Sequence, residues 1–132
     1  MKKELLNSDK ELLLKDLCAR LPYGVRMFEI EPVNNIQSNL TLLSITNKES
    51  VICITPSGGV IGSSIDTFKP YLFPLSSMTS KQKTELSMLV VGVEDIFKAF
   101  LIEVEFYHKH HIDYRGLIPM ELAIDATGLN IY

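Results

Sequence analysis

The residues best suited to chemistry lie together in one short run of the sequence, Tyr107–Gly116. This run holds all three histidines of the chain, together with an aspartate and an arginine. On a helix, Glu105, His108 and His111 are spaced by three residues and project from one side, with Asp113 shortly beyond. Imidazole and carboxylate groups bind zinc or iron, and an imidazole also exchanges protons near neutral pH. Any catalytic or metal chemistry of this chain is therefore expected here first.

The run does not complete a known metal or catalytic motif. A di-iron site in a helical bundle needs a second Glu-x-x-His motif and further glutamates on facing helices, and the sequence has no histidine outside this run. The HExxH motif of zinc enzymes is also absent. Histidines near a helix C-terminus have a structural use, because they interact favourably with the helix dipole and bond the last carbonyls. We therefore predict no metal, no cofactor and no catalytic residue. A metal-dependent enzyme built on His108, His111 and Asp113 is the least favoured alternative.

The turn Asp113–Gly116 favours a structural role. An aspartate and an arginine on either side of a tyrosine can cross-link a turn through charge-assisted hydrogen bonds. The tail after Gly116 is rich in Leu, Ile, Met and Tyr, so we expect this turn to hold the tail against the domain. An arginine that binds a carboxylate or a phosphate is the alternative. The candidate binding residues of the region are His108, His111, Asp113, Tyr114 and Arg115.

The other reactive groups also lack the neighbours that catalysis needs. Pro56–Ser64 is rich in glycine, but it has neither the Gly-Lys-Ser/Thr ending of a P-loop nor GxGxxG spacing. Its Gly58–Gly59 pair instead predicts a tight β-hairpin turn with at least one residue at positive φ. No serine lies in a G-x-S-x-G motif. Cys18 and Cys53 are isolated, and we expect both to be reduced and largely buried thiols.

Length and composition indicate one globular domain over residues 1–132. The chain is long enough for one hydrophobic core and too short for two ordinary domains. A hydrophobic content of 46% with 22% charged residues is the usual globular balance, which argues against wholesale disorder. The net charge of −3 disfavours general binding to nucleic acid, which depends on clustered Lys and Arg. No stretch resembles a secretory signal or a membrane span, so we expect a cytoplasmic protein that binds no membrane.

The first half of the chain predicts a helix followed by strands. A capping box at Ser8–Glu11 and leucines at helical spacing predict a helix over residues 9–21, which Pro22 ends. The charged residues of this helix, Asp16 and Arg20 among them, are interpreted as lying mostly off its apolar stripe.

Residues 23–66 alternate β-type runs with polar turns, two of them at Asn34–Asn35 and Asn47–Glu49. Because no helix separates successive strands, we predict a four- or five-stranded antiparallel meander or small barrel.

The second half of the chain predicts a connector and then helices. Pro70 and Pro74 are four residues apart, which favours an extended connector over residues 67–78 and disfavours a central strand. Residues 79–126 are predicted to be helical, beginning with a capping box at Thr79–Gln82. The clearest amphipathic stripe of the chain follows, and we expect it to be buried in the core. The predicted core joins Leu13, Leu17, Ile45 and Ile52 to Ile96, Phe97, Phe100 and Leu101.

Three blocks of the sequence stand out, namely Lys15–Val25, then Lys69–Leu72 with Pro74–Thr79, and then His110–Ile118. Together they resemble a group of small prophage and mobile-element proteins from gut anaerobic bacteria. This group has no established activity, so the resemblance implies only a context, that of an intracellular bacterial accessory protein. No residue inherits a role from it.

These observations together predict an α+β fold, with an N-terminal helix, an antiparallel sheet and a C-terminal helical hairpin packed on the sheet. The favoured function is that of a small binding or adaptor module that acts on a protein partner without catalysis. A nucleic-acid-binding accessory protein, using the sheet or the Lys109–Arg115 segment, is the first alternative. The identity of the partner and the oligomeric state stay open at this point.

Overall fold

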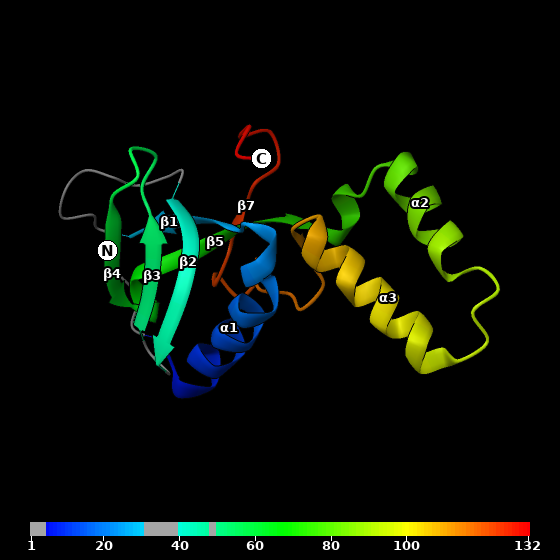
Figure 1. Ribbon diagram of the computed structural model, residues 1–132, viewed down its shortest axis with the longest axis horizontal. Helices are drawn as coiled ribbons and strands as arrows, with labels where there is room; N and C mark the ends of the chain where they lie inside the picture. Colours follow the sequence, from blue (N-terminus) through cyan, green and yellow to red (C-terminus); the bar gives the residue numbers. More distant parts are fainter. Residues whose placement is uncertain (1–4, 31–39, 48–49) are drawn as a thin grey trace.

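The computed structural model describes residues 5–30, 40–47 and 50–132 of the chain. It combines a curled β-sheet, the helix α1 packed against that sheet, and a helical hairpin that stands beside them (Figure 1). The turn predicted at Asn34–Asn35 and the residues Lys48 and Glu49 of the next predicted turn lie outside the described residues. The fold is α+β, as predicted, but its sheet is larger than expected and is mixed.

Helix α1 spans Asn7–Arg20 and begins two residues earlier than predicted. The capping box at Ser8–Glu11 does not form, because the amide of Lys10 already bonds to the carbonyl of Leu6 and Ser8 therefore lies inside the helix. The helix ends where Pro22 enters a 3-10 turn, and Gly24 then takes a left-handed conformation. The predicted end of this helix is confirmed.

Within the described residues the sheet contains seven strands, in the order β4-β3-β2-β1-β5-β6, with β7 also paired to β5. Strands β1 to β4 pair antiparallel with one another, as predicted, and β5 pairs antiparallel with β1, whereas β6 and β7 run parallel to β5. Strands β5, β6 and β7 were not predicted. The strands are β1 (Arg26–Glu29), β2 (Leu40–Asn47), β3 (Ser50–Ile54), β4 (Val60–Ser64), β5 (Phe68–Pro74), β6 (Ile112–Asp113) and β7 (Ile124–Asp125).

The short link between β4 and β5 requires the sheet to curl. The 3-10 turn Ile65–Thr67 joins the two strands, and a link of this length reaches at most ~14 Å. In a flat sheet the two strands would lie about 19 Å apart, because four strand spacings separate them. The sheet therefore curves back on itself around the side chains of its inner face.

Strand β5 replaces the connector predicted for residues 67–78. A proline fits an extended backbone, but it cannot donate a hydrogen bond. The residues between Pro70 and Pro74 make the bonds instead: the amide of Phe73 donates to the carbonyl of His111, and the carbonyl of Leu72 accepts from the amide of Ala126, both at 2.8 Å. The segment is extended, as predicted, but the prediction that it is not a central strand is wrong, because β1 pairs with residues 68–70 and β6 and β7 pair with residues 71–74.

The β-hairpin predicted at Gly58–Gly59 is confirmed. Strands β3 and β4 pair on either side of it, and Gly58 has a φ of 93°. The turn closes through the amide of Gly58 to the carbonyl of Thr55 and through the amide of Gly59 to the Thr55 hydroxyl.

The core lies between α1 and the inner face of the sheet. Leu13 and Leu17 are fully buried there, as predicted, while Ile45 packs partly buried against the core and Ile52 is half-buried. The C-terminal tail contributes Leu117, Leu122 and Ala123 to the same cluster. The other buried residues of the cluster are Val25, Met27, Leu40, Leu42, Val51, Cys53, Ile65, Phe68 and Leu72.

The helical hairpin consists of α2 (Ser80–Val90) and α3 (Ile96–Lys109). The capping box predicted at Thr79–Gln82 forms, and Asp95 caps α3. The helical prediction for residues 79–126 is wrong after Lys109. His111 and Gly116 take positive φ angles there, and the chain turns back to pair β6 and β7 with β5.

The amphipathic stripe of α3 lies outside the core, contrary to prediction. Ile96 and Phe97 are each 77% exposed, Phe100 is 60% exposed and Leu101 is 65% exposed. Figure 1 shows the reason: the hairpin points away from the sheet, and only the C-terminal end of α3, drawn in orange, reaches α1. We call these four side chains the α3 apolar face.

Candidate functional site

The predicted binding residues lie where the end of α3 meets α1 and β6. Three separate groups of contacts form there, one around Tyr114, one around Asp113 and one around His111. The position is set by the sequence at the end of α3, because His111 takes a φ of 59° and so reverses the chain into β6. The structure therefore brings the predicted residues into one region without aiming them at one point.

The three histidines diverge. His108 Nε2 lies 2.7 Å from the hydroxyl of Tyr114, and the ring of His110 lies against Phe106, with Nε2 3.9 Å from Glu85. His111 instead stacks on Tyr132, with ring centroids 3.7 Å apart. Within the described residues, no group of three or more His, Cys, Asp or Glu side chains could hold a metal ion. The absence of a bound metal stays a prediction, which elemental analysis of the purified protein would test.

A buried ionic network, which the sequence analysis missed, underlies this region. Asp16 and Arg20 of α1 are both fully buried. Arg20 donates from Nε to Asp16 Oδ2 and from Nη2 to the carbonyl of Ile112, both at 2.7 Å. Arg115 donates from Nε to the other oxygen of Asp16 at 3.1 Å. One carboxylate thus joins α1 to the segment after α3.

The sequence did contain a signal for this network. Asp16 and Arg20 are four residues apart and alternate with the buried leucines Leu13 and Leu17, so part of the apolar stripe of α1 is charged. A charged pair at helical spacing beside a buried stripe indicates an ion pair at the edge of the core. The interpretation that placed these two residues mostly off the stripe was wrong.

The ring of Tyr114 contacts two arginines and a second tyrosine. The guanidinium carbons of Arg115 and Arg20 are 5.0 Å and 5.7 Å from its ring centroid, and Tyr107 stacks on it at 5.6 Å. Burial lowers the pKa of His108, and the positive charge of Arg20 adds to this effect. Burial also raises the pKa of Tyr114. Both partners of the His108–Tyr114 hydrogen bond are therefore neutral near pH 7, as suits a structural contact.

Asp113 forms the turn that the sequence predicted, with different partners. Its carboxylate is buried and accepts hydrogen bonds from the amides of Leu117 and Ile118, both at 2.9 Å. Arg115, the other half of the predicted lock, bonds to Asp16 instead. Asp113 and Arg115 both stabilise the fold, and the two oxygens of Asp113 are already engaged.

Contacts of His111 and Tyr132 hold the end of the C-terminal tail against β5. The Tyr132 hydroxyl donates to the carbonyl of Tyr71 at 2.7 Å and accepts from the amide of Arg26 at 2.8 Å. His111 Nδ1 is buried and has no hydrogen-bond partner among the described residues. Burial, helped by the positive charge of Arg20, lowers the pKa of His111 to about 4. The imidazole is therefore neutral in the folded protein down to mildly acidic pH.

This pKa predicts that acid destabilises the fold through His111. As the pH falls below the ordinary value of 6.5, the unfolded chain gains a proton at His111 that the folded chain does not take up until about pH 4. Folding stability should decrease over this range by up to about 3 kcal/mol. Urea unfolding of the wild type and of His111→Phe, measured across this pH range, should show a smaller decrease for the variant.

The matched control is His110→Phe, which removes a neighbouring imidazole that is partly exposed beside Glu85. Equal acid sensitivity in the wild type and His111→Phe would exclude His111 as the source of the effect.

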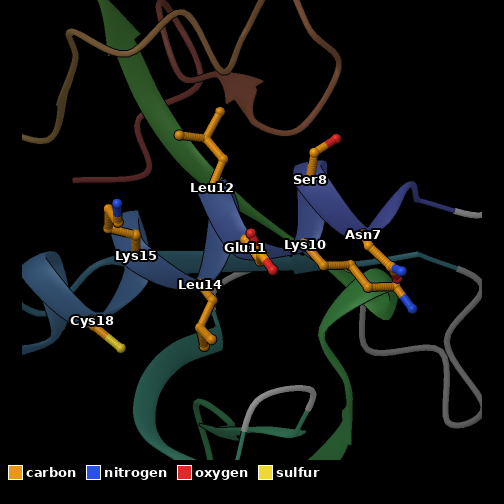
Figure 2. A pocket seen from close by; sticks show the side chains of 8 residues that line it. All are labelled: Asn7, Ser8, Lys10, Glu11, Leu12, Leu14, Lys15 and Cys18. Carbon is orange, nitrogen blue, oxygen red and sulfur yellow. The ribbon is translucent and has the colours of Figure 1, made fainter.

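A hollow beside α1 offers no converging chemistry. Within the described residues it is lined by α1 alone, as Figure 2 shows. Ser8 and Leu12 project from one side of the helix, and Leu14 and Cys18 project from the other. Cys18 is exposed, contrary to prediction, whereas Cys53 is buried as predicted. These side chains do not face a shared point, so the hollow is not a candidate catalytic site.

The α3 apolar face is the other candidate site, and its exposed side chains are apolar and carry no group for acid–base or metal chemistry. The opposite side of α3 faces α2. There Ile102 and Phe106 line a groove together with Met88 and Leu89 of α2. The apolar side chains of α3 thus surround much of the helix, a pattern that is usual for a buried helix. The predicted amphipathic stripe was the signal for this face, although it had been assigned to the core.

In comparisons with protein-family models, with curated proteins and with solved structures, no match to this chain was found. Among the described residues, no helix has both the length and the apolar character that a membrane crossing requires.

Proposed function

We propose that this chain is a small, non-catalytic protein-binding module and that its binding surface is the α3 apolar face. The exposure of Ile96, Phe97, Phe100 and Leu101 on one helix is the observation that carries this proposal. Burying each such side chain contributes about 1.5–3 kcal/mol. A contiguous exposed patch of large apolar side chains is typical of a protein–protein contact site.

The polar region at the end of α3 supports the same conclusion by its internal contacts. Asp113 holds the tail, Arg115 holds Asp16, and His108 bonds to Tyr114. These groups stabilise the position of α3 relative to α1, so they contribute to binding by orienting the hairpin. The nucleic-acid alternative loses support, because Arg115 of the Lys109–Arg115 segment is bound to Asp16 and is less available to a phosphate.

The resemblance of three sequence blocks to prophage and mobile-element proteins adds a context to the proposal. In that context the chain would act in the bacterial cytoplasm as an accessory protein that recognises another protein.

A stability comparison tests whether the face is free for a partner. In dilute protein, Phe100→Ala should lower the free energy of unfolding by less than about 1 kcal/mol, because exposed substitutions have small effects. Phe106→Ala is the matched control: the same change on the same helix at a side chain that is 4% exposed. It should cost about 3–5 kcal/mol. Urea unfolding followed by circular dichroism measures both.

The same proteins should differ in the binding of a hydrophobic dye. The wild type should bind 8-anilinonaphthalene-1-sulfonate, and the variant Phe97→Ser/Phe100→Ser should bind it less while it stays folded. If Phe100→Ala destabilised the dilute chain as much as Phe106→Ala, the face would be buried within one chain and the proposed function would be lost.

A further inference from the structure

We propose that the slot which the chain's own Tyr132 fills is a binding site for a phenol group carried by another molecule, such as a tyrosine side chain. The slot is formed by Arg26 of β1, Tyr71 and Phe73 of β5, and His111 just before β6. Tyr132 is its resident occupant, and a ligand from outside the chain competes with it. This site is separate from the α3 apolar face, so it adds a second binding function to the chain.

The slot offers one hydrogen-bond donor and one acceptor at a missing rung of the sheet. The amide of Ile30 donates to the carbonyl of Thr67. Every second pair of an antiparallel register is bonded, so the amide of Arg26 would bond directly to the carbonyl of Tyr71 in a regular sheet. The hydroxyl of Tyr132 lies between these two groups instead. It accepts from the Arg26 amide at 2.8 Å and donates to the Tyr71 carbonyl at 2.7 Å.

Two rings form the walls of the slot. The imidazole of His111 stacks on the ring of Tyr132, with centroids 3.7 Å apart and planes at 12°, and the ring of Phe73 lies at 5.8 Å. Burial lowers the pKa of His111 to about 4, so its ring is neutral near pH 7. The walls therefore suit a flat, uncharged aromatic ring, and the donor and acceptor suit a hydroxyl on that ring. A phenol meets both requirements.

The slot is built from elements that hold their positions without the end of the tail. Arg26 and Tyr71 belong to strands that pair with each other through the residues beside them. The amide of Phe73 donates to the carbonyl of His111 at 2.8 Å, which joins the two aromatic walls. None of these contacts involves residues 127–132, so the slot stays formed when Tyr132 leaves it.

The segment that carries Tyr132 is loosely held. Residues 127–130 are all exposed, and Figure 1 shows the end of the tail as a loop beyond β7. The amide of Thr127 bonds to the carboxylate of Asp125, and the amide of Leu129 bonds to the carbonyl of Ala126, so these contacts are local. Tyr132 can therefore leave the slot without moving a buried side chain of the tail.

Tyr132 also leaves part of the slot unused. Its side chain fills the space between the walls only in part, because the residue remains 44% exposed. Nδ1 of His111 is buried and has no hydrogen-bond partner among the described residues. A ligand that covers the slot more fully gains contacts that Tyr132 does not make, which allows it to compete with a tethered group.

Binding of para-cresol to full-length variants tests the site. The amide resonance of Arg26 in a proton–nitrogen NMR spectrum should shift in Tyr132→Ala, and para-cresol should return it towards its wild-type position with saturation. Toluene has the same ring and methyl group without the hydroxyl, and it should bind this variant at least about ten-fold more weakly. The wild type should bind para-cresol at least about ten-fold more weakly than Tyr132→Ala, because the tethered tyrosine competes.

Two further variants complete the design. Tyr132→Phe keeps the stacked ring and loses both hydrogen bonds, so its affinity for para-cresol should lie between those of the wild type and Tyr132→Ala. This variant also provides the test if Tyr132→Ala does not fold. Leu129→Ala is the matched control, because it changes an exposed residue of the same segment and should bind para-cresol like the wild type.

A peptide with the sequence of residues 127–132 distinguishes the sources of the phenol group. If it binds Tyr132→Ala at least about ten-fold more tightly than para-cresol does, the ligand is the tail of a second copy. Equal affinities would mean that the tyrosine side chain alone is recognised, whichever molecule carries it.

Three results would overturn the site. The first is the absence of para-cresol binding to both Tyr132→Ala and Tyr132→Phe. The second is equal binding of toluene and para-cresol, which would show an apolar cavity without recognition of the hydroxyl. The third is equal affinity of the wild type and Tyr132→Ala for para-cresol, which would place the bound phenol outside the slot.

Discussion

A chain shortened to end at Gly116 is expected to lose its cooperative unfolding transition. The deleted tail supplies Leu117 and Leu122, which are almost completely buried, and Ala123 and Ala126 beside them. Emptying each leucine site costs about 2–5 kcal/mol. The whole fold is worth only about 5–15 kcal/mol, so the two leucine sites together remove most of its stability.

The tail also holds the sheet together. It provides β7, which pairs with β5, and the Tyr132 hydroxyl, which bonds to the carbonyl of Tyr71. Asp113 would in addition lose the amides of Leu117 and Ile118 and be left as a buried carboxylate without donors. The truncated chain should therefore be less soluble and should show no sigmoidal melting curve by circular dichroism.

A milder truncation serves as the control for this experiment. Removing Tyr132 alone deletes the stacking on His111 and two hydrogen bonds, but it keeps every buried residue of the tail in place. That chain should melt cooperatively at a lower temperature than the full-length chain. If the chain ending at Gly116 melted like the full-length protein, the tail would not belong to the core.

The second large effect is expected for Asp16→Ala, which should lower the free energy of unfolding by about 3–5 kcal/mol. The reason is the charge that remains. Arg20 is fully buried, and without Asp16 its guanidinium keeps carbonyl contacts, the nearest to Ile112 at 2.7 Å, and the ring of Tyr114, but it has no carboxylate among the described residues. Arg115 loses its ion pair at the same time. An uncompensated buried charge is among the most destabilising changes in a core.

Glu11→Ala is the matched control, because it removes an exposed carboxylate from the same helix and should change stability by less than about 0.5 kcal/mol. Arg115→Ala should have an intermediate effect, since its side chain is partly exposed. Urea unfolding of the three variants at neutral pH makes the comparison. Equal stability of Asp16→Ala and Glu11→Ala would mean that the network carries no net stabilisation.

The sequence alone determined the features that depend on neighbouring residues. The end of α1 at Pro22, the capping box at Thr79–Gln82 and the glycine turn at Gly58 were all predicted. Each one follows from backbone geometry or from a hydrogen bond over a few residues, which the local sequence is enough to specify. The antiparallel pairing of β3 with β4 followed in the same way, because the short turn at Gly58–Gly59 leaves the two strands few alternatives.

The tertiary structure alone decided which apolar surfaces meet. The stripe of α3 is more regular in sequence than that of α1, yet Leu13 and Leu17 are buried and Phe97 and Phe100 are exposed. A periodic stripe shows that a helix has an apolar side, but it does not contain the identity of the surface that covers that side.

The same limit explains the other errors. Strand β5 formed because its partners β1, β6 and β7 lie about 40 to 50 residues away along the chain, and the local sequence around Pro70 does not specify them. The Asp16 carboxylate likewise pairs with an arginine on a distant segment. Burial of a charge depends on whether such a partner arrives, and that is a property of the whole fold.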